Sequence, residues 1–368
     1  MNLNIAHISP QSREQSSSFV QSHLNGIKGN VIHYHGGQFP TEVENQKLPR
    51  LNWIEKVQFK IFNKIKGCNI TQFQLFKSLK KNNTDLVFVE YGTIASSVYA
   101  SVRAMKIPLI VHFHGFDAHH IPTLKKYKVK YDSFLMDRPN IIVVSQLMKQ
   151  LVLSWGVPEK NILYTPCGCD PKFVQAEIPS ERKGFLTVGN FVSKKGPLIT
   201  IKAFAKALEF GITEKLTMIG DGPLWEECKN WVSSQNLENQ IIFKGKLDHN
   251  EIFEWMKKSR VFLQHSITLE DGNKEGTPVS ILEASGMQMP IISTTHAGIN
   301  DVVIQNKTGI LVEEGDINAM AMAIKKLHDD MALSHEMGIN GRQLVAENYT
   351  SQHHLDKINN WIEKIISS

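Results

Sequence analysis

Cysteines and long apolar runs are both scarce in this sequence. Its 368 residues include four cysteines, of which Cys167 and Cys169 lie close together. A zinc site needs about four ligands in characteristic pairs, so we expect buried, reduced cysteines and no zinc. No run approaches the roughly 20 apolar residues that cross a bilayer, and the start of the chain lacks the basic and apolar regions of a signal segment. The sequence therefore predicts a cytoplasmic protein.

The composition is that of an ordinary globular protein. Apolar residues make up 42% and charged residues 21% of the chain, which excludes a largely disordered protein. A chain of 368 residues is long for one domain, so two domains are expected. Residues 1–180 carry 21 basic and 12 acidic residues, whereas residues 181–368 carry 20 and 24. The two halves should therefore meet different partners.

Short β-rich segments alternate with longer helical patterns along the whole chain, as in parallel sheets covered by helices on both faces. The expected strands cover residues 3–8, 31–35, 86–90, 109–114, 141–145 and 162–165, and then 185–189, 216–220, 241–244, 261–264, 290–294 and 309–312. Between Pro166 and Gly184 the periodicity stops, so we place the joint of two doubly wound domains there. Ligands of such folds collect at the carboxyl ends of strands, which predicts a site in the cleft between the domains.

The segment from Glu275 to Glu283 is the most informative part of the chain. It reads Glu-Gly-Thr-Pro-Val-Ser-Ile-Leu-Glu, and a helix start is expected inside it. Thr277 suits the position just before a helix, and Pro278 suits the first helical position. Glu283 would then lie about 7.5 Å along the helix from Pro278, while Glu275 stays in the preceding loop.

This layout suits a ligand that carries both phosphate and hydroxyl groups. The unpaired N–H groups and the positive dipole end of a helix start attract phosphate. An ionised carboxylate accepts O–H donors, such as the vicinal hydroxyls of a sugar. The segment thus predicts a sugar-nucleotide site, with the sugar at Glu275, the diphosphate at the helix start and the ribose at Glu283. The alternative is that two glutamates merely solvate a surface helix.

With its continuation to Gly298, this segment resembles the Glu-x7-Glu signature of the family 4 retaining glycosyltransferases, similar to those of bacterial capsule, exopolysaccharide and lipopolysaccharide synthesis. Further similar segments follow the family's order over nearly the whole chain. The resemblance implies a GT-B fold, an α/β architecture in which two doubly wound, Rossmann-like domains face a central cleft. It also implies an acceptor domain over residues 1–175, a donor domain over residues 180–350, and a final helix over residues 351–368 that packs back on the first domain.

The resemblance also implies roles around the donor. Gly189, Asn190 and Lys195 stand where the family has a Gly-Arg…Lys-Gly loop, whose cations neutralise the diphosphate as the leaving group gains charge. Lys195 matches the family, but Asn190 replaces an arginine, so that Lys194, another base or the helix start has to compensate. A solvated lysine pair on a turn is the alternative. The implied donor-binding residues are Gly189, Asn190, Gly276, Thr277, Pro278, Val279 and Glu283.

His114 ends an expected strand, where loops face the predicted site. The segment from His112 to Asp117 resembles the family's His-Gly motif, which places a histidine beside the donor sugar and the reacting centre. His114 is the match, and with Glu275 and Lys195 it completes the implied catalytic set. His112 is a candidate support for that site, and Asp117 is expected to hold either the loop or the histidine. The alternative is an ordinary core histidine.

Two loops are expected to border the acceptor. One precedes the first expected helix and contains Arg13 and Ser18, and the other follows an expected strand and contains Glu90 and Tyr91. Both patterns are weak, and plain turns fit them equally well.

The stretch over residues 51–66 has the pattern of a basic amphipathic helix. One face carries Trp53, Ile54, Val57, Ile61, Phe62 and Ile65, and a stripe of Lys56, Lys60 and Lys64 runs beside it. Such helices lie on anionic membrane surfaces, and the positive charge of the first half favours that interpretation. A helix that packs its apolar face on the sheet is the alternative.

Together these observations predict a retaining hexosyltransferase. It would move a hexosyl unit from a nucleotide-diphosphate sugar, with UDP favoured over GDP, to a hydroxyl of a surface glycan or lipid-linked acceptor. The chain contains no Asp-x-Asp pair, so neither a metal nor another cofactor is implied, and nothing indicates nucleic acid. The cytoplasmic protein would touch the inner face of the cell membrane through residues 51–66. A sugar-nucleotide epimerase of the same fold and a catalytically silent binding subunit are the alternatives.

Overall fold

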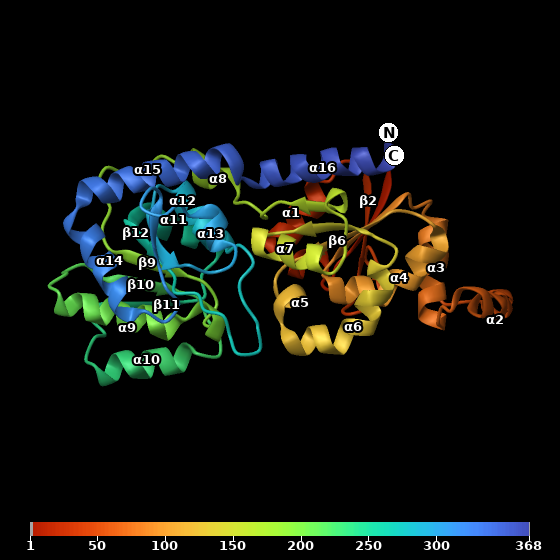
Figure 1. Ribbon diagram of the computed structural model, residues 1–368, viewed down its shortest axis with the longest axis horizontal. Coiled ribbons are helices and arrows are strands. Elements are labelled where there is room, and N and C mark those ends of the chain that lie inside the picture. Colours follow the sequence, from red (N-terminus) through yellow and green to blue (C-terminus); the bar gives the residue numbers. More distant parts are fainter. Residues whose placement is uncertain (1–2, 368) are drawn as a thin grey trace. The chain divides into compact units, whose positions relative to one another are not determined.

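The computed structural model describes residues 3–367, and these form two compact units (Figure 1). Unit 1 contains the residues up to Thr165 and those from His354 onward, and unit 2 contains Pro166–His353. Met1, Asn2 and Ser368, which belong to the expected terminal segments, lie outside the described residues.

Unit 1 is built on an eight-stranded sheet in the order β4-β3-β2-β1-β5-β6-β7-β8. Its parallel strands are β1 (Asn4–Ile8), β2 (Asn30–His35), β5 (Leu86–Glu90), β6 (Leu109–Phe113), β7 (Asn140–Val143) and β8 (Ile162–Tyr164). A short antiparallel hairpin, β3 (Glu42–Val43) and β4 (Gln46–Lys47), extends the sheet at β2. The helices are α1 (Ser18–Gly26), α2 (Trp53–Lys66), α3 (Ile70–Lys81), α4 (Gly92–Met105), α5 (Phe116–His119), α6 (Ile121–Leu135), α7 (Gln146–Ser154) and most of α16 (Ser351–Ser367), with short 3-10 turns at Arg13–Gln15 and Glu159–Asn161.

Unit 2 is built on a six-stranded parallel sheet in the order β11-β10-β9-β12-β13-β14. Its strands are β9 (Phe185–Val188), β10 (Leu216–Ile219), β11 (Ile241–Gly245), β12 (Val261–Leu263), β13 (Ile291–Thr294) and β14 (Gly309–Val312). Its helices are α8 (Pro171–Gln175), η3 (Ser193–Lys195), α9 (Pro197–Glu209), α10 (Trp225–Ser234), α11 (His249–Lys258), α12 (Val279–Gly286), α13 (Ile299–Val302), α14 (Ile317–Asp329) and α15 (Met331–Asn348).

The central strands are apolar because helices cover both faces of each sheet. In β5 all five residues are buried, so its sequence runs apolar up to Glu90 without alternation. The twelve strands expected from the sequence are all present, and their ends lie within two residues of the predicted ones. The pattern does not predict the hairpin β3–β4, because two-residue strands are too short to show a periodicity.

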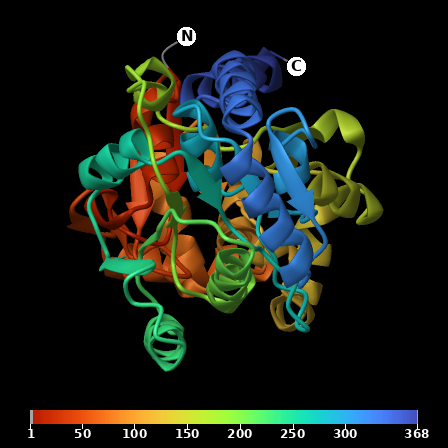
Figure 2. The same cartoon turned by 90° about the vertical axis from the view of Figure 1, so that its left-hand side faces the viewer.

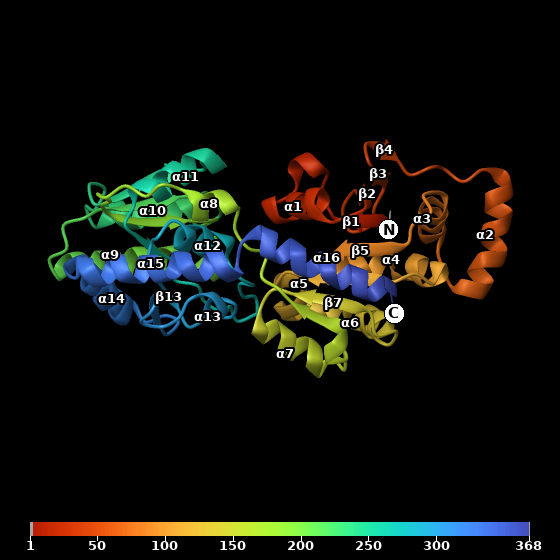
Figure 3. The ribbon, with the colours of Figure 1, turned by 90° about the horizontal axis from the view of Figure 1, so that it is seen from above.

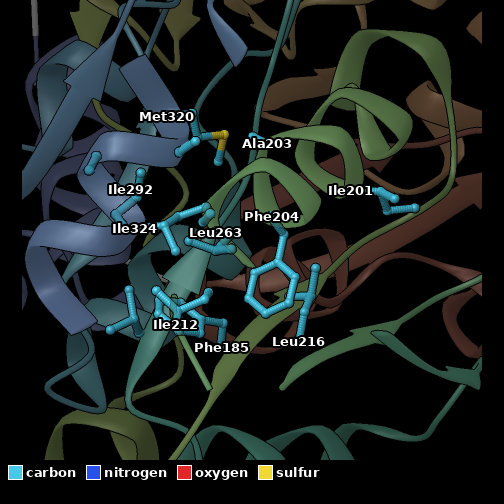
Figure 4. Close-up of a cluster of buried hydrophobic side chains, with 14 of the residues drawn as sticks. Phe185, Ile201, Ala203, Phe204, Ile212, Leu216, Leu263, Ile292, Met320 and Ile324 are labelled. Carbon is cyan, nitrogen blue, oxygen red and sulfur yellow. The ribbon is translucent and has the colours of Figure 1, made fainter. Parts of the chain in front are cut away.

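The larger core of unit 2 lies between its sheet and the helices α9 and α14 (Figure 4). Phe204 of α9 meets Phe185 of β9 edge to face, with ring centroids 5.5 Å apart, and Met320 and Ile324 come from α14. Interdigitated aromatic and branched side chains of this kind contribute most of the burial that stabilises a domain. Figure 2 looks onto this unit and shows α10 at its edge.

The C-terminal helix α16 contributes to the core of unit 1. Leu355, Ile358 and Ile362 belong to the buried apolar cluster that also contains strand residues of this unit. Asn359 Nδ2 donates a hydrogen bond to the carbonyl of Gly26 at 3.0 Å, and its Oδ1 accepts from the N–H of Lys28 at 2.8 Å. A Cβ on Gly26 would lie 2.3 Å from Leu355 Cδ1, so a larger residue there would push the helix outward.

Each sheet has a point where the strand order reverses. In unit 1, β1 lies between β2 and β5, and in unit 2, β9 lies between β10 and β12. Crossover connections leave in opposite directions at such a point, so the loops after these strands separate and leave room for a ligand at the carboxyl ends. A ligand site is therefore expected at the loops that follow β1 and β5 in unit 1 and at those that follow β9 and β12 in unit 2.

Among the described helices, none combines the length and the apolar character that a membrane span requires. All four cysteines are buried and free, which confirms their expected place as small core side chains. Burial and the nearby carboxylate of Glu283 raise the pKa of the Cys169 thiol. This cysteine is therefore a protonated, unreactive group at neutral pH.

Candidate active site

Glu275 lies in the loop between β12 and α12, where two lysines hold it. Lys194 Nζ is 3.2 Å from its Oε1, and Lys195 Nζ is 3.2 Å from its Oε2. Only 6% of Glu275 is exposed. Burial alone would raise the pKa of this carboxyl, but the charges of Lys195 and Lys194 lower it to about 2. The structure thus brings Glu275 and Lys195 into direct contact as an ionised cluster, and adds Lys194 to it.

A neighbouring turn fixes the backbone of the Glu275 loop. The N–H of Gly298 donates to the carbonyl of Gly276 at 3.0 Å, and a Cβ on Gly298 would lie 2.3 Å from that oxygen. His296 Nε2 accepts the N–H of Glu275 at 3.0 Å, so the proton of the neutral ring lies on Nδ1, which is 2.5 Å from Glu314 Oε1. No local sequence pattern indicates this role of His296, because its partner Glu314 lies 18 residues away in the chain.

The helix after Glu275 begins one residue later than predicted. Helix α12 starts at Val279, and Pro278 occupies the capping position with φ −66° and ψ 118°. The prediction of Thr277 as the cap and Pro278 as the first helical residue is therefore wrong by one position. Proline fits either place because it lacks an N–H group that the helix would have to satisfy. The N–H groups of the first turn still lie between the two glutamates in sequence, so the expected phosphate site stays at this helix end.

Glu283 projects from α12 and is 7% exposed. Its environment differs from that of Glu275, since the one ion-pair contact of its carboxylate in the described chain is His249 Nε2 at 3.7 Å. Burial raises the pKa of Glu283 to about 7, while Lys172 lowers it and Asp170 raises it. The two glutamates therefore differ chemically: Glu275 is ionised, and Glu283 changes its charge near neutral pH.

Two glycines shape the loop that carries the lysines. Gly189 follows β9, and a Cβ there would lie 3.2 Å from Lys195 Cδ. Gly196 has a φ of +49° at the start of α9, and a Cβ there would lie 2.1 Å from the carbonyl oxygen of His265. The chain can turn this tightly only with glycine at the second position, and the turn brings Lys195 back over the end of β9. Asn190 is exposed in the same loop.

In unit 1, two carboxylates fix His114 in the loop after β6. Its Nε2 lies 2.7 Å from Glu90 Oε2, and its backbone N–H donates to Asp117 Oδ1 at 2.9 Å. The rings of Phe19 and Tyr91 flank the imidazole, with centroids 4.5 and 4.7 Å away. Asp117 thus holds the loop, which is one of the two roles expected for it.

Glu90, at the end of β5, is buried in unit 1. Its side chain is fully buried, and histidines occupy both of its oxygens. Alternation along β5 turns Glu90 toward the face of the sheet that carries His23 of α1, so the acceptor contact expected from the sequence does not fit this burial. Arg13 and Ser18 are exposed, and Tyr91 is partly exposed.

Two hollows of unit 1 lie away from these residues. One, of about 730 Å³, is lined by residues that precede β6 and β7, including Pro108 and Pro139. The other, of about 690 Å³, lies beside the ends of α6 and α7. Both are at the amino ends of strands, whereas ligands of parallel sheets bind at the carboxyl ends.

Comparison with known families gives two matches that together span most of the chain. The model described as "Glycosyltransferase Family 4" matches residues 27–173, and the model described as "Glycosyl transferases group 1" matches residues 170–344. The boundary between them, near residue 170, falls close to the end of the first segment of unit 1.

Several curated proteins are similar in sequence. The amylovoran biosynthesis glycosyltransferase AmsK of Erwinia amylovora is 26% identical over 66% of this chain and 61% of its own length. The capsular polysaccharide biosynthesis glycosyltransferase CapM of Staphylococcus aureus is 30% identical over 72% of this chain and 73% of its own. The UDP-Gal:alpha-D-GlcNAc-diphosphoundecaprenol alpha-1,3-galactosyltransferase of Escherichia coli is 26% identical over 80% and 79%. The match with AmsK thus leaves more than a third of that relative uncovered.

A solved structure resembles the whole chain. The crystal structure of a glycosyltransferase from Rickettsia africae superposes with a TM-score of 0.77, at 20% identity, and covers 100% of this chain and 99% of that one. At this identity the likeness shows the fold alone, and it confirms the expected architecture of two Rossmann-like, parallel-sheet domains.

Proposed function

The chain belongs to glycosyltransferase family 4, and from this premise we propose that it is a retaining hexosyltransferase that uses a nucleotide-diphosphate sugar. The observation that carries the proposal is the contact of Glu275 with Lys194 and Lys195 in the loops after β12 and β9. An ionised carboxylate and two cations side by side match the two parts of such a donor, sugar hydroxyls and a diphosphate.

In the proposed complex, unit 2 binds the donor. Sugar hydroxyls donate to Glu275, and the diphosphate lies against Lys195 and the amino ends of α9 and α12, where the helix dipoles favour an anion. The ribose hydroxyls donate to Glu283. As the leaving diphosphate gains charge, the lysines stabilise it electrostatically, and this positive charge supports a reaction that needs no divalent metal.

The proposed transfer exchanges one bond to the anomeric carbon for another. The bond from this carbon to the diphosphate oxygen breaks, and the acceptor oxygen bonds to the same face. The acceptor proton passes to the leaving phosphate oxygen, so no covalent enzyme intermediate forms and the anomeric configuration is retained. We assign His114 to the reacting end of the sugar, in line with the His-Gly motif.

We propose UDP as the nucleotide and a surface glycan or its lipid-linked precursor as the acceptor. The support comes from the relatives, since the E. coli protein is named for a UDP-galactose donor and a diphosphoundecaprenol acceptor. Arg13, Ser18 and Tyr91 are the acceptor-side candidates that retain exposed surface in unit 1.

The exposed face of α2 supports contact of this enzyme with a membrane. The apolar side chains of Trp53, Ile54, Val57 and Ile61 are 75%, 49%, 53% and 62% exposed, and Lys56, Lys60 and Lys64 are exposed as well. The helix packs instead through its other side, where the ring centroids of Phe62 and Phe73 of α3 lie 4.8 Å apart. Figure 3 shows α2 at the end of unit 1 beyond α3. Packing of the apolar face on the sheet, the alternative, does not fit these exposures. The side chains of Ile65 and Lys66 lie outside the described part.

Two linked experiments test the proposed donor site and its stereochemistry. Glu283→Ala should weaken binding of UDP by about 10- to 150-fold, the loss of a charge-assisted hydrogen bond, whereas Glu275→Gln should leave UDP binding nearly intact and impair transfer. Calorimetry separates the two effects, and equal loss of UDP affinity in both variants contradicts the assignment. The anomeric proton coupling in the product should match that of the donor. Inversion, epimerised donor without an acceptor product, or binding without any chemistry would each overturn the proposal.

A further inference from the structure

Glu90 is a fully buried carboxylate, and the partners of its side chain among the described residues are histidines. Its Oε1 lies 2.9 Å from His7 Nε2 and 2.6 Å from His23 Nδ1, and its Oε2 lies 2.7 Å from His114 Nε2. His112 Nδ1 approaches the same Oε2 at 3.4 Å. In the described part of the chain, no ion pair joins Glu90 to a lysine or arginine. Burying an ionised carboxylate among imidazoles costs free energy of folding, and this cost points to a functional role for Glu90.

The bonds around Glu90 determine which nitrogen of each ring carries a proton. Burial alone would raise the pKa of Glu90, but the charge of His23 and the polar contacts of His112, His114 and His23 hold it well below its usual range. An ionised carboxylate can only accept. His114 must therefore donate through Nε2, and in the neutral ring Nδ1 is then the acceptor.

The hydrogen-bonded chain continues from Glu90 to the C-terminal helix. His23 Nε2 lies 2.8 Å from His354 Nε2 on α16, and His354 Nδ1 lies 3.0 Å from Thr165 Oγ1. Thr165 ends the first segment of unit 1, and His354 begins its second segment. Glu90 thus connects His114 to Thr165 and His354, the two residues of unit 1 between which the chain forms unit 2.

The short contact between His23 and His354 indicates a shared proton rather than a metal ion. His23, His112 and His354 have the residue types and the proximity of a metal site. Two imidazole nitrogens on a tetrahedral zinc ion lie about 3.3 Å apart, given a Zn–N bond of about 2.05 Å. The observed 2.8 Å is shorter and suits an N–H···N hydrogen bond.

We propose that Glu90 is a positioning residue for His114, which it holds in one orientation with the proton on Nε2, and that it ties this ring to α16 through His23 and His354. The proposal rests on the proposed function, in which His114 lies at the reacting sugar. Asp117 fixes the backbone of His114 and Glu90 fixes its ring, so the imidazole is preorganised before the donor binds.

The tautomer of His114 in the natural protein is the first test of this proposal. In a two-bond ¹⁵N–¹H spectrum of histidine-labelled protein, with the signal assigned by its loss in His114→Gln, His114 should be protonated at Nε2 and not at Nδ1. Glu90→Gln should convert it to a mixture of tautomers, since the amide offers one acceptor oxygen in place of two. A ring protonated at Nδ1 alone in the natural protein would overturn the proposal even if the enzyme is active.

Steady-state kinetics test whether Glu90 affects catalysis. Glu90→Gln should lower kcat by about 10- to 150-fold, the loss of a charge-assisted hydrogen bond, with little change in the donor KM because the interaction matters in the transition state. Glu44→Gln is the matched control in the same unit, since its carboxylate accepts from the backbone N–H of His33 and does not touch Glu90. It should leave kcat unchanged.

A double-mutant cycle separates positioning from a general structural role. If Glu90 acts through His114, the double variant Glu90→Gln with His114→Gln should be no slower than His114→Gln alone. Additive losses would overturn the proposal, as would one zinc ion per chain that is lost in His354→Gln. Absence of transfer by the natural protein would contradict the proposed function instead, and the tautomer measurement would still decide the role of Glu90.

Discussion

At the scale of single residues, the two glutamates of the Glu275–Glu283 segment show how surroundings set chemistry. Both are nearly fully buried, and burial by itself raises the pKa of each. Glu275 has two lysines at 3.2 Å, which lower its pKa to about 2. Among the described residues Glu283 has no lysine in ion-pair contact, and burial outweighs the charge of Lys172 and raises its pKa to about 7. One carboxylate is thus permanently charged, and the other titrates in the physiological range.

The first prediction concerns the pH dependence of nucleotide binding. Glu283 must be ionised to accept two ribose hydroxyls, and its pKa in the free protein is about 7. Below this pH the carboxyl is protonated, so the affinity for UDP should fall by up to about tenfold for each unit from pH 7 downward. Calorimetric titrations between pH 5.5 and 8.5 measure this slope.

Glu283→Gln is the control for this pH dependence. The variant keeps the shape of the side chain and loses the titrating proton, so its affinity should be lower at pH 8 and should vary less with pH. Ionisation of the UDP phosphate itself affects both proteins equally and cancels in the comparison. The same slope in both proteins would show that Glu283 does not titrate on binding.

At the scale of elements, α2 shows that the spacing of apolar residues predicts a helix and its apolar residues, but does not predict what each of them contacts. The sequence places Phe62 with Trp53, Ile54 and Val57 on one apolar face. In the structure, Phe62 packs on Phe73 and Phe76 of α3, and the other three are exposed. A helix that is anchored by aromatic rings on one side can present tryptophan and lysine on the other, as interfacial helices do.

The second prediction is that α2 binds anionic membranes. Replacing Lys56, Lys60 and Lys64 with glutamate should reduce co-sedimentation with vesicles that contain anionic lipid, because each lysine near such a surface contributes about 1 kcal/mol. Folding should be preserved, since these side chains are exposed. Fluorescence of Trp53, which is 75% exposed, should shift to shorter wavelength on binding.

A charge-matched variant shows whether the effect belongs to α2. Lys246, Lys258 and Lys326 are three exposed lysines of unit 2, and their replacement with glutamate changes the net charge by the same amount. That variant should bind vesicles nearly as well as the natural protein. If both triple variants lose binding equally, net charge alone would explain the attraction, and α2 would have no special part.

At the scale of the whole molecule, buried histidines make the stability of unit 1 depend on pH. Burial and the charge of His114 lower the pKa of His112 to about 3, and burial lowers that of His7 as well. Burial and the charges of His23 and His112 hold the pKa of His354 well below its ordinary value. In the unfolded chain these groups titrate near pH 6.5, so the unfolded state binds more protons between pH 6.5 and these lowered values. Stability therefore falls as the pH falls.

The third prediction is that the buried histidines destabilise the fold as the pH falls from 7 to 5. His112 alone should lower the free energy of unfolding by about 2 kcal/mol over this range, given its pKa of about 3 in the folded state. Urea denaturation at successive pH values measures the change. The depressed carboxyl groups Glu90 and Glu275 contribute mainly below their unfolded value near pH 4.5. Glu283, whose pKa is raised to about 7, takes up a proton in the folded protein within this window and opposes the histidines. The measurement is therefore made on the Glu283→Gln variant, in which this opposing contribution is absent.

His112→Gln is the matched variant for the stability profile. Its midpoint should be lower at pH 7, where a buried imidazole is lost, and should fall less steeply toward pH 5. If the midpoint of the Glu283→Gln variant stays constant between pH 7 and pH 5, the buried histidines gain no protons on unfolding.

The sequence by itself determined the order of strands and helices and the residues of the donor loop. It could do so because buried parallel strands are continuous apolar runs, and because Gly189, Lys195, Glu275 and Pro278 act within short segments whose local pattern is readable. The spacing of apolar residues also predicts the C-terminal helix α16.

Only the tertiary structure decided what surrounds each of these groups. Glu90 is separated by 83 residues from His7 and by 67 from His23, and His354 reaches His23 across 331, so no local pattern reveals that a loop candidate for the acceptor is the buried centre of a histidine cluster. The pKa difference between Glu275 and Glu283 likewise depends on Lys195 and Lys194, which lie 80 and 81 residues from Glu275 in the chain. Burial and charge act through space, and chain spacing does not record them.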